Sequence, residues 1–288
     1  MKKTVYFTKD ISPEKVAALF DSVGKDLKGR VAVKVHSGEK GNQNFLKPSF
    51  WKPVIDKVGG TVVECNTAYE GERDTAEKHK RLLTDHGWDA LYKTRILDDS
   101  SPDTVLDIPG GKVIKKNYVG NGINDYDSML VLSHFKGHPM GGFGGAIKQL
   151  SIGLASSFGK AYIHGAGVPE NIWTADHDSF LEAMADAASS VVDFFDGNIV
   201  YINVMKNMSV DCDCCAVAED PCIADIGMLA SDDPVAIDKA CIDLVNACED
   251  KGKTHFLERV ESRNGTHTID AAADMGVGSK DYELIIID

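Results

Sequence analysis

The chain has 288 residues, of which 43% are hydrophobic and 26% are charged, as is ordinary for a globular protein. Its formal net charge is -13 and its lysines and arginines form no cluster, so we expect neither nucleic acid nor an anionic membrane surface as a partner. No apolar segment approaches the length of a transmembrane helix, and the first residues, MKKTVYFTKD, lack the apolar core of a secretory signal. These features predict a cytoplasmic protein.

Strands and helices alternate in the first part of the chain. The predicted strands are 3–8, 31–35 and 61–65, and the predicted helices follow Ser12-Pro13 and span 48–58 and 73–86. This order predicts an α/β fold with a mainly parallel sheet flanked by helices. The length suits one large domain or two tightly joined lobes, residues 1–128 and 129–288.

The second part continues this alternation after a possible edge strand at 112–119. A buried strand at 129–132 leads through a polar corner and a glycine turn into a helix that begins near Ala146. Ser179 and Glu182 form a capping box that predicts a helix over 179–195. Later predicted elements are strands at 198–205, 225–231 and 282–288, a helix capped by Asp233 with Pro234 at its first position, and a short helical pair.

A cysteine cluster follows the strand at 198–205. Cys212, Cys214 and Cys215 lie together, and Cys222 is close in sequence. In an extended segment Cys212 and Cys214 point the same way, so both could bind one zinc ion or an iron–sulfur centre, with further ligands from elsewhere. The alternative is a group of reduced thiols without a metal.

A second candidate site follows the strand at 129–132. His134 and His138 are possible metal ligands, or one of them is a general base, and Lys136 could neutralise a substrate carboxylate or phosphate. The alternative is a solvated loop whose histidines have ordinary hydrogen-bond partners.

The glycine turn next to it is a third candidate. Backbone N–H groups at the start of a helix attract anions, so we expect a small anion at the turn, with Lys148 nearby. The four glycines are Gly141, Gly142, Gly144 and Gly145. The alternative is a tight turn that needs glycine for its backbone angles. The segment matches no phosphate-loop or dinucleotide pattern, so it carries no nucleotide fingerprint.

Polar residues also follow the strands at 31–35 and 61–65. His36 and Glu39 come after the first, and Asn66 after the second. Because parallel strands end at one edge of the sheet, we expect these residues to share a cleft with His134, Lys136 and His138. In that cleft His36 or Glu39 would move a proton and Asn66 would contact the substrate.

The chain resembles domain-of-unknown-function family 362, whose members are often labelled iron–sulfur centre proteins. The matching segments are 34–42, 66–73, 133–160, 211–214 and 225–245. Many relatives carry a ferredoxin-like insert with two four-cysteine motifs, but this chain has no cysteine between Cys65 and Cys212. The resemblance therefore extends to His36, Glu39, the histidine loop, the glycine turn and the cysteine pair, and not to the electron transfer of the insert. It leaves the activity undefined.

Together these residues predict a metalloprotein that acts as an enzyme. Cys212 and Cys214, with His134 or His138, would bind zinc or an iron–sulfur centre, and the glycine turn with Lys136 and Lys148 would hold an anionic small molecule. One alternative is a metal-independent enzyme acting on a small carboxylate or phosphate. Another is a metal-binding or redox-sensing module without catalysis.

Overall fold

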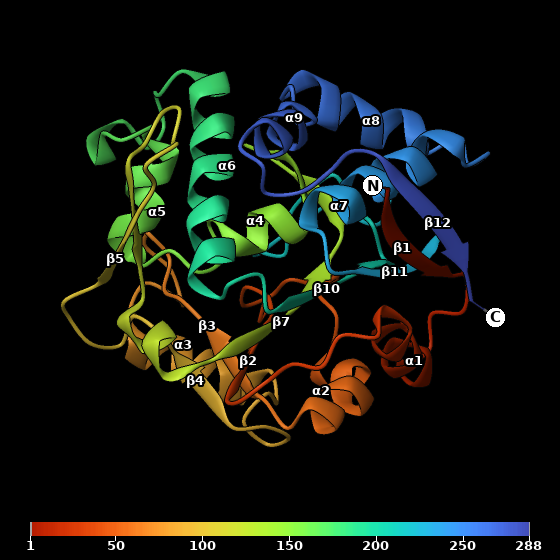
Figure 1. Ribbon diagram of the computed structural model, residues 1–288, viewed down its shortest axis with the longest axis horizontal. Helices are drawn as coiled ribbons and strands as arrows, with labels where there is room; N and C mark the ends of the chain where they lie inside the picture. Colours follow the sequence, from red (N-terminus) through yellow and green to blue (C-terminus); the bar gives the residue numbers. More distant parts are fainter. Residues whose placement is uncertain (1, 288) are drawn as a thin grey trace.

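A computed structural model describes residues 2–287 and places eight strands in one central sheet (Figure 1). Their spatial order is β12-β1-β11-β10-β7-β2-β3-β4. Every neighbouring pair is parallel except the two that β11 forms with β1 and β10. The strands are β1 (Lys3–Thr8), β2 (Val31–Lys34), β3 (Thr61–Glu64), β4 (Thr94–Ile96), β7 (Ser128–His134), β10 (Ile199–Met205), β11 (Gly227–Ser231) and β12 (Tyr282–Ile286). The predicted α/β fold with a mainly parallel sheet is confirmed.

Helices cover both faces of this sheet. Figure 1 shows α4, α6 and α7 on one face and α1 and α2 on the other. The helices are α1 (Pro13–Val23), α2 (Lys52–Val58), α3 (Ala76–Asp85), α4 (Ala146–Leu150), α5 (Ser157–His164), α6 (His177–Phe194), α7 (Pro234–Ala247), α8 (Lys253–Ser262) and α9 (His267–Asp274). None of the helices described within 2–287 is long and apolar enough to span a bilayer.

The central strand β7 is buried along its whole length, and its residues 129–132 are all apolar because both faces of the strand are covered. Met129 and Val131 pack into the core beneath α4, α6 and α7, and Leu130 and Leu132 pack into the core against α1 and α2. β7 lies between β2 and β10, so strands from both halves of the chain belong to one sheet.

Two small hairpins lie outside the sheet. The predicted edge strand becomes β6 (Lys116–Val119), which pairs with β5 (Thr104–Asp107) and not with the main sheet. The second hairpin joins β8 (Lys136–His138) to β9 (Gly142–Gly144), with Lys136 opposite Gly144 and His138 opposite Gly142. The polar corner and the glycine turn are therefore the two arms of one hairpin.

The start of α6 differs from the sequence prediction. The helix begins at His177, and its N-cap is Asp176, whose carboxylate accepts a hydrogen bond from the backbone N–H of Ser179 at 3.0 Å. The Asp176 carboxylate occupies the capping position that we expected Ser179 to fill. The helix α5, capped by the Ser156 hydroxyl, is an addition that the sequence patterns did not predict.

The carboxyl ends of four neighbouring strands carry the residues of interest. In spatial order β10, β7, β2 and β3 lead into the cysteine cluster, the β8–β9 hairpin, His36 and the segment 65–73. Parallel strands place these ends at one edge of the sheet, where α/β proteins form ligand sites.

Candidate functional site

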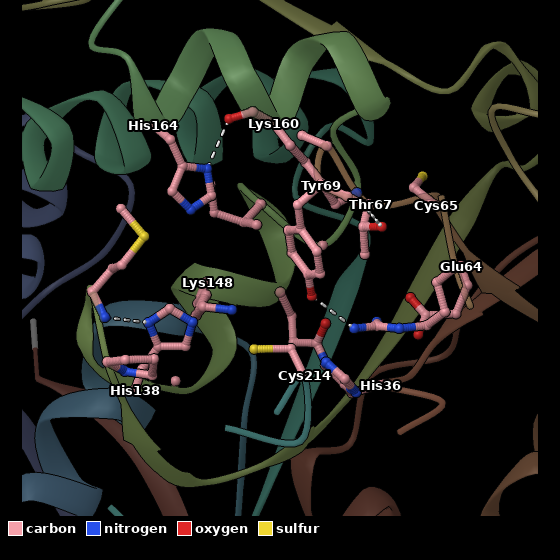
Figure 2. Close-up of a pocket in the computed structure, with 18 of the residues that line it drawn as sticks. His36, Glu64, Cys65, Thr67, Tyr69, His138, Lys148, Lys160, His164 and Cys214 are labelled. Carbon is pink, nitrogen blue, oxygen red and sulfur yellow. Dashed lines mark hydrogen bonds between the residues drawn. The ribbon is translucent and has the colours of Figure 1, made fainter. Parts of the chain in front are cut away.

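A cavity of about 310 Å³ lies at this edge of the sheet, between the strand ends and α5 (Figure 2). Its polar lining is mostly basic. The basic and thiol side chains that line it include Lys34, His36, Arg73, Lys136, His138, Lys148, Lys160, His164 and Cys214. Glu64 is the carboxylate that lines it. This excess of positive charge suits a small anionic ligand.

Three soft ligand groups meet at one end of the cavity. The ligand atoms of His138, Cys212 and Cys214 all lie within 4.8 Å of one another. His138 comes from β8, and the cysteines come from the segment after β10, about 75 residues later in the chain. Cys212 is 1% exposed, whereas Cys214 borders the cavity. The fold thus brings the predicted histidine loop and cysteine cluster together.

The Cys212 thiol has unusual surroundings for a buried cysteine. Its contact with Cys214 and its burial both work to raise its pKa, but the positive charges of Lys148 and Lys136 outweigh them, and the pKa is lowered. The side chains of His36 and His138 both lie beside it, and its charge works to raise the pKa of each histidine. The site therefore favours a thiolate at Cys212.

The hydrogen bonds of the two rings fix where their protons lie. Nδ1 of His36 accepts from the backbone N–H of Gly38 at 3.1 Å. Nδ1 of His138 accepts from the backbone N–H groups of Met140 and Gly141 at 3.1 and 2.9 Å. In the neutral rings the proton is therefore on Nε2, which can donate it toward Cys212. Burial lowers the pKa of both histidines to about 4, so both are neutral at pH 7.

The side chains of His134 and Lys136 both contact the Asp213 carboxylate, which limits their availability to a ligand. Nδ1 of His134 and Nζ of Lys136 each lie 3.0 Å from the Asp213 carboxylate, and Nε2 of His134 contacts the carbonyl oxygen of Lys206. Both nitrogens of His134 thus face acceptors and neither is available to a metal. The cluster includes His138 and excludes His134, which corrects the expectation that either could serve. Lys136 lines the cavity but is already neutralised.

Glu39 and Asn66 lie behind the cavity and do not line it. The Glu39 carboxylate pairs with Nε of Arg73 at 3.0 Å, and both side chains are buried. The Asn66 side chain contacts Nδ1 of His79 at 3.4 Å. Glu39 therefore positions Arg73, and the predicted roles in proton transfer and substrate contact have no support from this placement.

The glycine turn already holds an anion, which belongs to the protein. The Asp238 carboxylate of α7 accepts from the backbone N–H groups of Ala146 and Ile147 at 2.8 and 3.0 Å. A Cβ atom at Gly145 would lie 2.3 Å from Asp238 Oδ1, so glycine is needed there for close approach. Gly144 and Gly145 border the cavity, whereas Gly141 and Gly142 do not. The turn therefore binds Asp238 in place of the external anion that we expected.

Lys160 and His164 belong to the site and were not among the predicted residues. They are four residues apart on α5, so both point from one face of this helix into the cavity (Figure 2). The spacing was visible in the sequence, but without a predicted helix at 157–164 it gave no reason to connect the two residues with the site.

Most of the chain matches one known protein family. A sequence model of the family described as "Domain of unknown function (DUF362)" matches residues 31–243. No curated protein matches significantly.

Two solved structures are similar in fold. One is the lactate racemase apoprotein from Thermoanaerobacterium thermosaccharolyticum, at 15% identity and a TM-score of 0.44, over 69% of this chain and 50% of that one. The other is a protein from Thermotoga maritima, at 12% identity and a TM-score of 0.47, over 91% of this chain and 58% of that one. The chain thus spans little more than half the length of either protein.

Proposed function

The chain belongs to the family described as a domain of unknown function (DUF362), and from that premise we propose that it is a metalloenzyme acting on a small anionic molecule. In this proposal His138, Cys212 and Cys214 bind one soft divalent ion of the zinc type. The observation that carries the proposal is the convergence of these three ligand atoms within 4.8 Å at one end of a basic cavity.

The donor set fits a single ion better than a cluster. Two thiolates and one imidazole match the three protein ligands of many catalytic zinc sites, which keep one position open for water or substrate. A four-cysteine iron–sulfur cluster needs a fourth thiolate beside Cys212, Cys214 and Cys215. The next candidate, Cys222, has its sulfur on the carbonyl oxygen of Met208 at 3.5 Å. We therefore favour zinc over iron–sulfur.

The remaining residues have roles that do not depend on which ion is bound. A bound zinc-type ion would supply Lewis acidity. His36 lies beside Cys212, and because its Nδ1 accepts from Gly38 its Nε2–H would be free to support the thiolate, as outer hydrogen bonds do around metal ligands. The lysines of the cavity attract the negative charge of the substrate. Because His138 and Cys214 border the cavity, the substrate would reach the ion directly.

The test is a zinc titration of metal-free protein, followed by competition with a chromophoric chelator. We expect one ion per chain, with affinity at least about 100-fold lower in Cys212→Ser and in Cys214→Ser. Cys215→Ser is the matched control, because Cys215 is adjacent but outside the three-residue group, and it should bind as the parent does. Undiminished zinc binding by the Cys212→Ser and Cys214→Ser variants would refute the proposal.

Binding should also release protons and weaken in acid. The ion would displace any protons on the Cys212 and Cys214 sulfurs, so affinity should fall as the pH is lowered from 8 to about 6. Titrations in buffers of different ionisation enthalpy measure the number of protons released.

A second candidate is a metal-independent enzyme that acts on a small carboxylate or phosphate. It is favoured by the cationic lining and by the lowered pKa of the Cys212 thiol, which would exist without a metal. This candidate requires that chelators leave both the thermal stability and the binding of small anions unchanged.

A further inference from the structure

Two lysines of the cavity have charges that no carboxylate neutralises. Three other cations that line the cavity each have a buried carboxylate within 3.0 Å: Lys34, Arg73 and Lys136. Within residues 2–287 neither Lys148 nor Lys160 forms such a pair. Nζ of Lys160 donates a hydrogen bond to the carbonyl oxygen of Ala155 at 2.6 Å, and the residue is 8% exposed, so burial lowers its pKa. A buried ammonium without a counterion is costly, so an anion in the cavity would be stabilised here.

His164 lines the same cavity as these two lysines and has a fixed tautomer. Its Nδ1 is 2.8 Å from the carbonyl oxygen of Lys160, which can only accept, so Nδ1 carries the ring proton. Nε2 is therefore an acceptor. Figure 2 shows this second nitrogen pointing into the cavity on the side of Lys148. The ring is held by stacking on Phe180, with centroids 4.9 Å apart and planes at 15°.

The other histidines that line the cavity have the opposite arrangement. Nδ1 of His36 and Nδ1 of His138 accept backbone hydrogen bonds, so their Nε2 atoms are donors. His134 has both nitrogens against acceptors. Among the described residues that line the cavity, His164 is thus the imidazole that offers a lone pair to a ligand in the metal-free protein. Burial, assisted by Lys148 and Lys160, lowers the pKa of His164 to about 4, so the lone pair stays available at neutral pH.

We propose that this end of the cavity binds small oxyanions that carry an O–H group, such as protonated phosphate. Lys148 and Lys160 meet the negative charge, and Nε2 of His164 accepts the hydrogen bond from the O–H. A fully deprotonated oxyanion would place an acceptor against the lone pair of His164, which is repulsive and leaves a buried acceptor unpaired. The site therefore distinguishes oxyanions by their protonation as well as by their charge.

This inference rests on the proposed function only in taking the cavity as the binding place of a small anion, and it requires no metal. Phosphate and sulfate are a suitable pair of probes, because they have the same shape but only phosphate keeps an O–H at pH 7. Calorimetric titration of metal-free protein at constant ionic strength should show phosphate binding about tenfold or more tightly than sulfate, the effect of one well-made hydrogen bond to a charged partner.

Three variants separate the contributions. His164→Phe keeps an aromatic ring on Phe180 but removes the acceptor, so phosphate affinity should fall to that of sulfate. Lys148→Met should weaken both anions by about tenfold or more, because both interact with its charge. Lys57→Met is the control, since this exposed lysine pairs with Asp21 far from the cavity, and it should change neither affinity.

Equal binding of the two anions by the parent protein, or binding of neither at millimolar concentration, would overturn the inference. Should His164→Phe fail to fold, two-bond proton–nitrogen correlation spectra of the parent protein give the tautomer of His164 directly. A proton on Nε2 would also overturn it. The zinc titration is a separate measurement. A protein that binds no zinc but prefers phosphate to sulfate would refute the metal site and leave this inference intact. A protein that binds zinc but does not distinguish the two anions would refute this inference and leave the metal site intact.

Discussion

Asp213 contacts two basic side chains with one carboxylate at the floor of the site. His134 and Lys136 each lie 3.0 Å from it, and all three side chains are at most 5% exposed. Burial works to raise the pKa of Asp213, but His134 and Lys136 together hold it well below its usual range. A shared counterion of this kind fixes the start of the β8–β9 hairpin and hence the position of His138.

Removal of that charge should be costly. In Asp213→Asn the buried ammonium of Lys136 loses its counterion and His134 loses an acceptor, so we expect the free energy of unfolding to fall by about 3 kcal/mol or more at pH 7. Asp56→Asn, which breaks an exposed pair with Lys52, should cost less than about 1 kcal/mol. Urea denaturation measures both.

The difference between the Asp213 variant and its parent should shrink in acid. Because the folded-state pKa of Asp213 lies below the unfolded value, its stabilisation is present above about pH 4 and is lost as the pH falls further. An equal difference at pH 7 and pH 3 would contradict this assignment.

At the scale of elements, the N-terminus of α4 is capped by a residue of α7, a helix that lies about 90 residues later in the chain. Asp238 of α7 binds the first two N–H groups of α4 and also accepts from the Asn203 side chain of β10 at 2.7 Å. One carboxylate thus ties together two helices and a strand. It is possible only because Gly145 leaves room for it.

Two neighbouring glycines give a sharp comparison. In Gly145→Ala the new Cβ would collide with the Asp238 carboxylate, and we expect a loss of about 1–3 kcal/mol in the free energy of unfolding. In Gly144→Ala the nearest atom, at 3.3 Å, is Cδ of the Lys148 side chain, which can move. The free energy of unfolding should therefore fall much less in Gly144→Ala than in Gly145→Ala. Equal losses of stability in the two variants would show that the close approach to Asp238 is not why position 145 needs glycine.

This turn also shows where sequence reasoning reaches its limit. The glycines and the following helix led us to expect an external anion at the backbone N–H groups, where the structure has the Asp238 carboxylate. The identity of that anion depended on Asp238, about 90 residues later in the chain, and no spacing rule connects the two. The capping box failed for a local reason, since Asp176 competes with Ser179 for the same position.

At the scale of the whole molecule, periodicity was the reliable signal. The apolar strand 129–132 and the alternation of strands and helices predicted the parallel sheet, and the topology then brought His36, His138 and Cys212 together at one edge. What the sequence could not provide was the pairing of charges. Asp213 pairs with Lys136, so within the described part of the chain Lys148 is the one of these two lysines that is left without a carboxylate partner. The sequence does not show this pairing, because it depends on the fold that brings Asp213 to Lys136.

The buried histidines should make the whole fold sensitive to acid. The pKa values of His36, His138 and His164 are lowered to about 4 and that of His79 to about 3, all mainly by burial. Between the unfolded value near 6.5 and these folded values the unfolded chain binds more protons, so stability falls as the pH falls. Asp238 opposes this, because burial raises its pKa to about 6.

At pH 5 the four histidines and Asp238 together should take up about three protons when the chain unfolds. The slope of unfolding free energy against pH, obtained from denaturation curves between pH 4.5 and 6.5, measures this number. A flat profile in that range would mean that these histidines are accessible to protons in the folded state.

The position of β1 in the sheet also bears on how the protein is made. Its two neighbours are β11 and β12, and Tyr6, for example, is opposite Ala230, about 220 residues later in the chain. At roughly 5–20 residues per second, a ribosome would need about 10–45 s to deliver that partner after β1 itself. β1 is therefore paired long after it is synthesised, and Val5 and Phe7 must wait, with their apolar side chains available to chaperones, until β11 and β12 are translated.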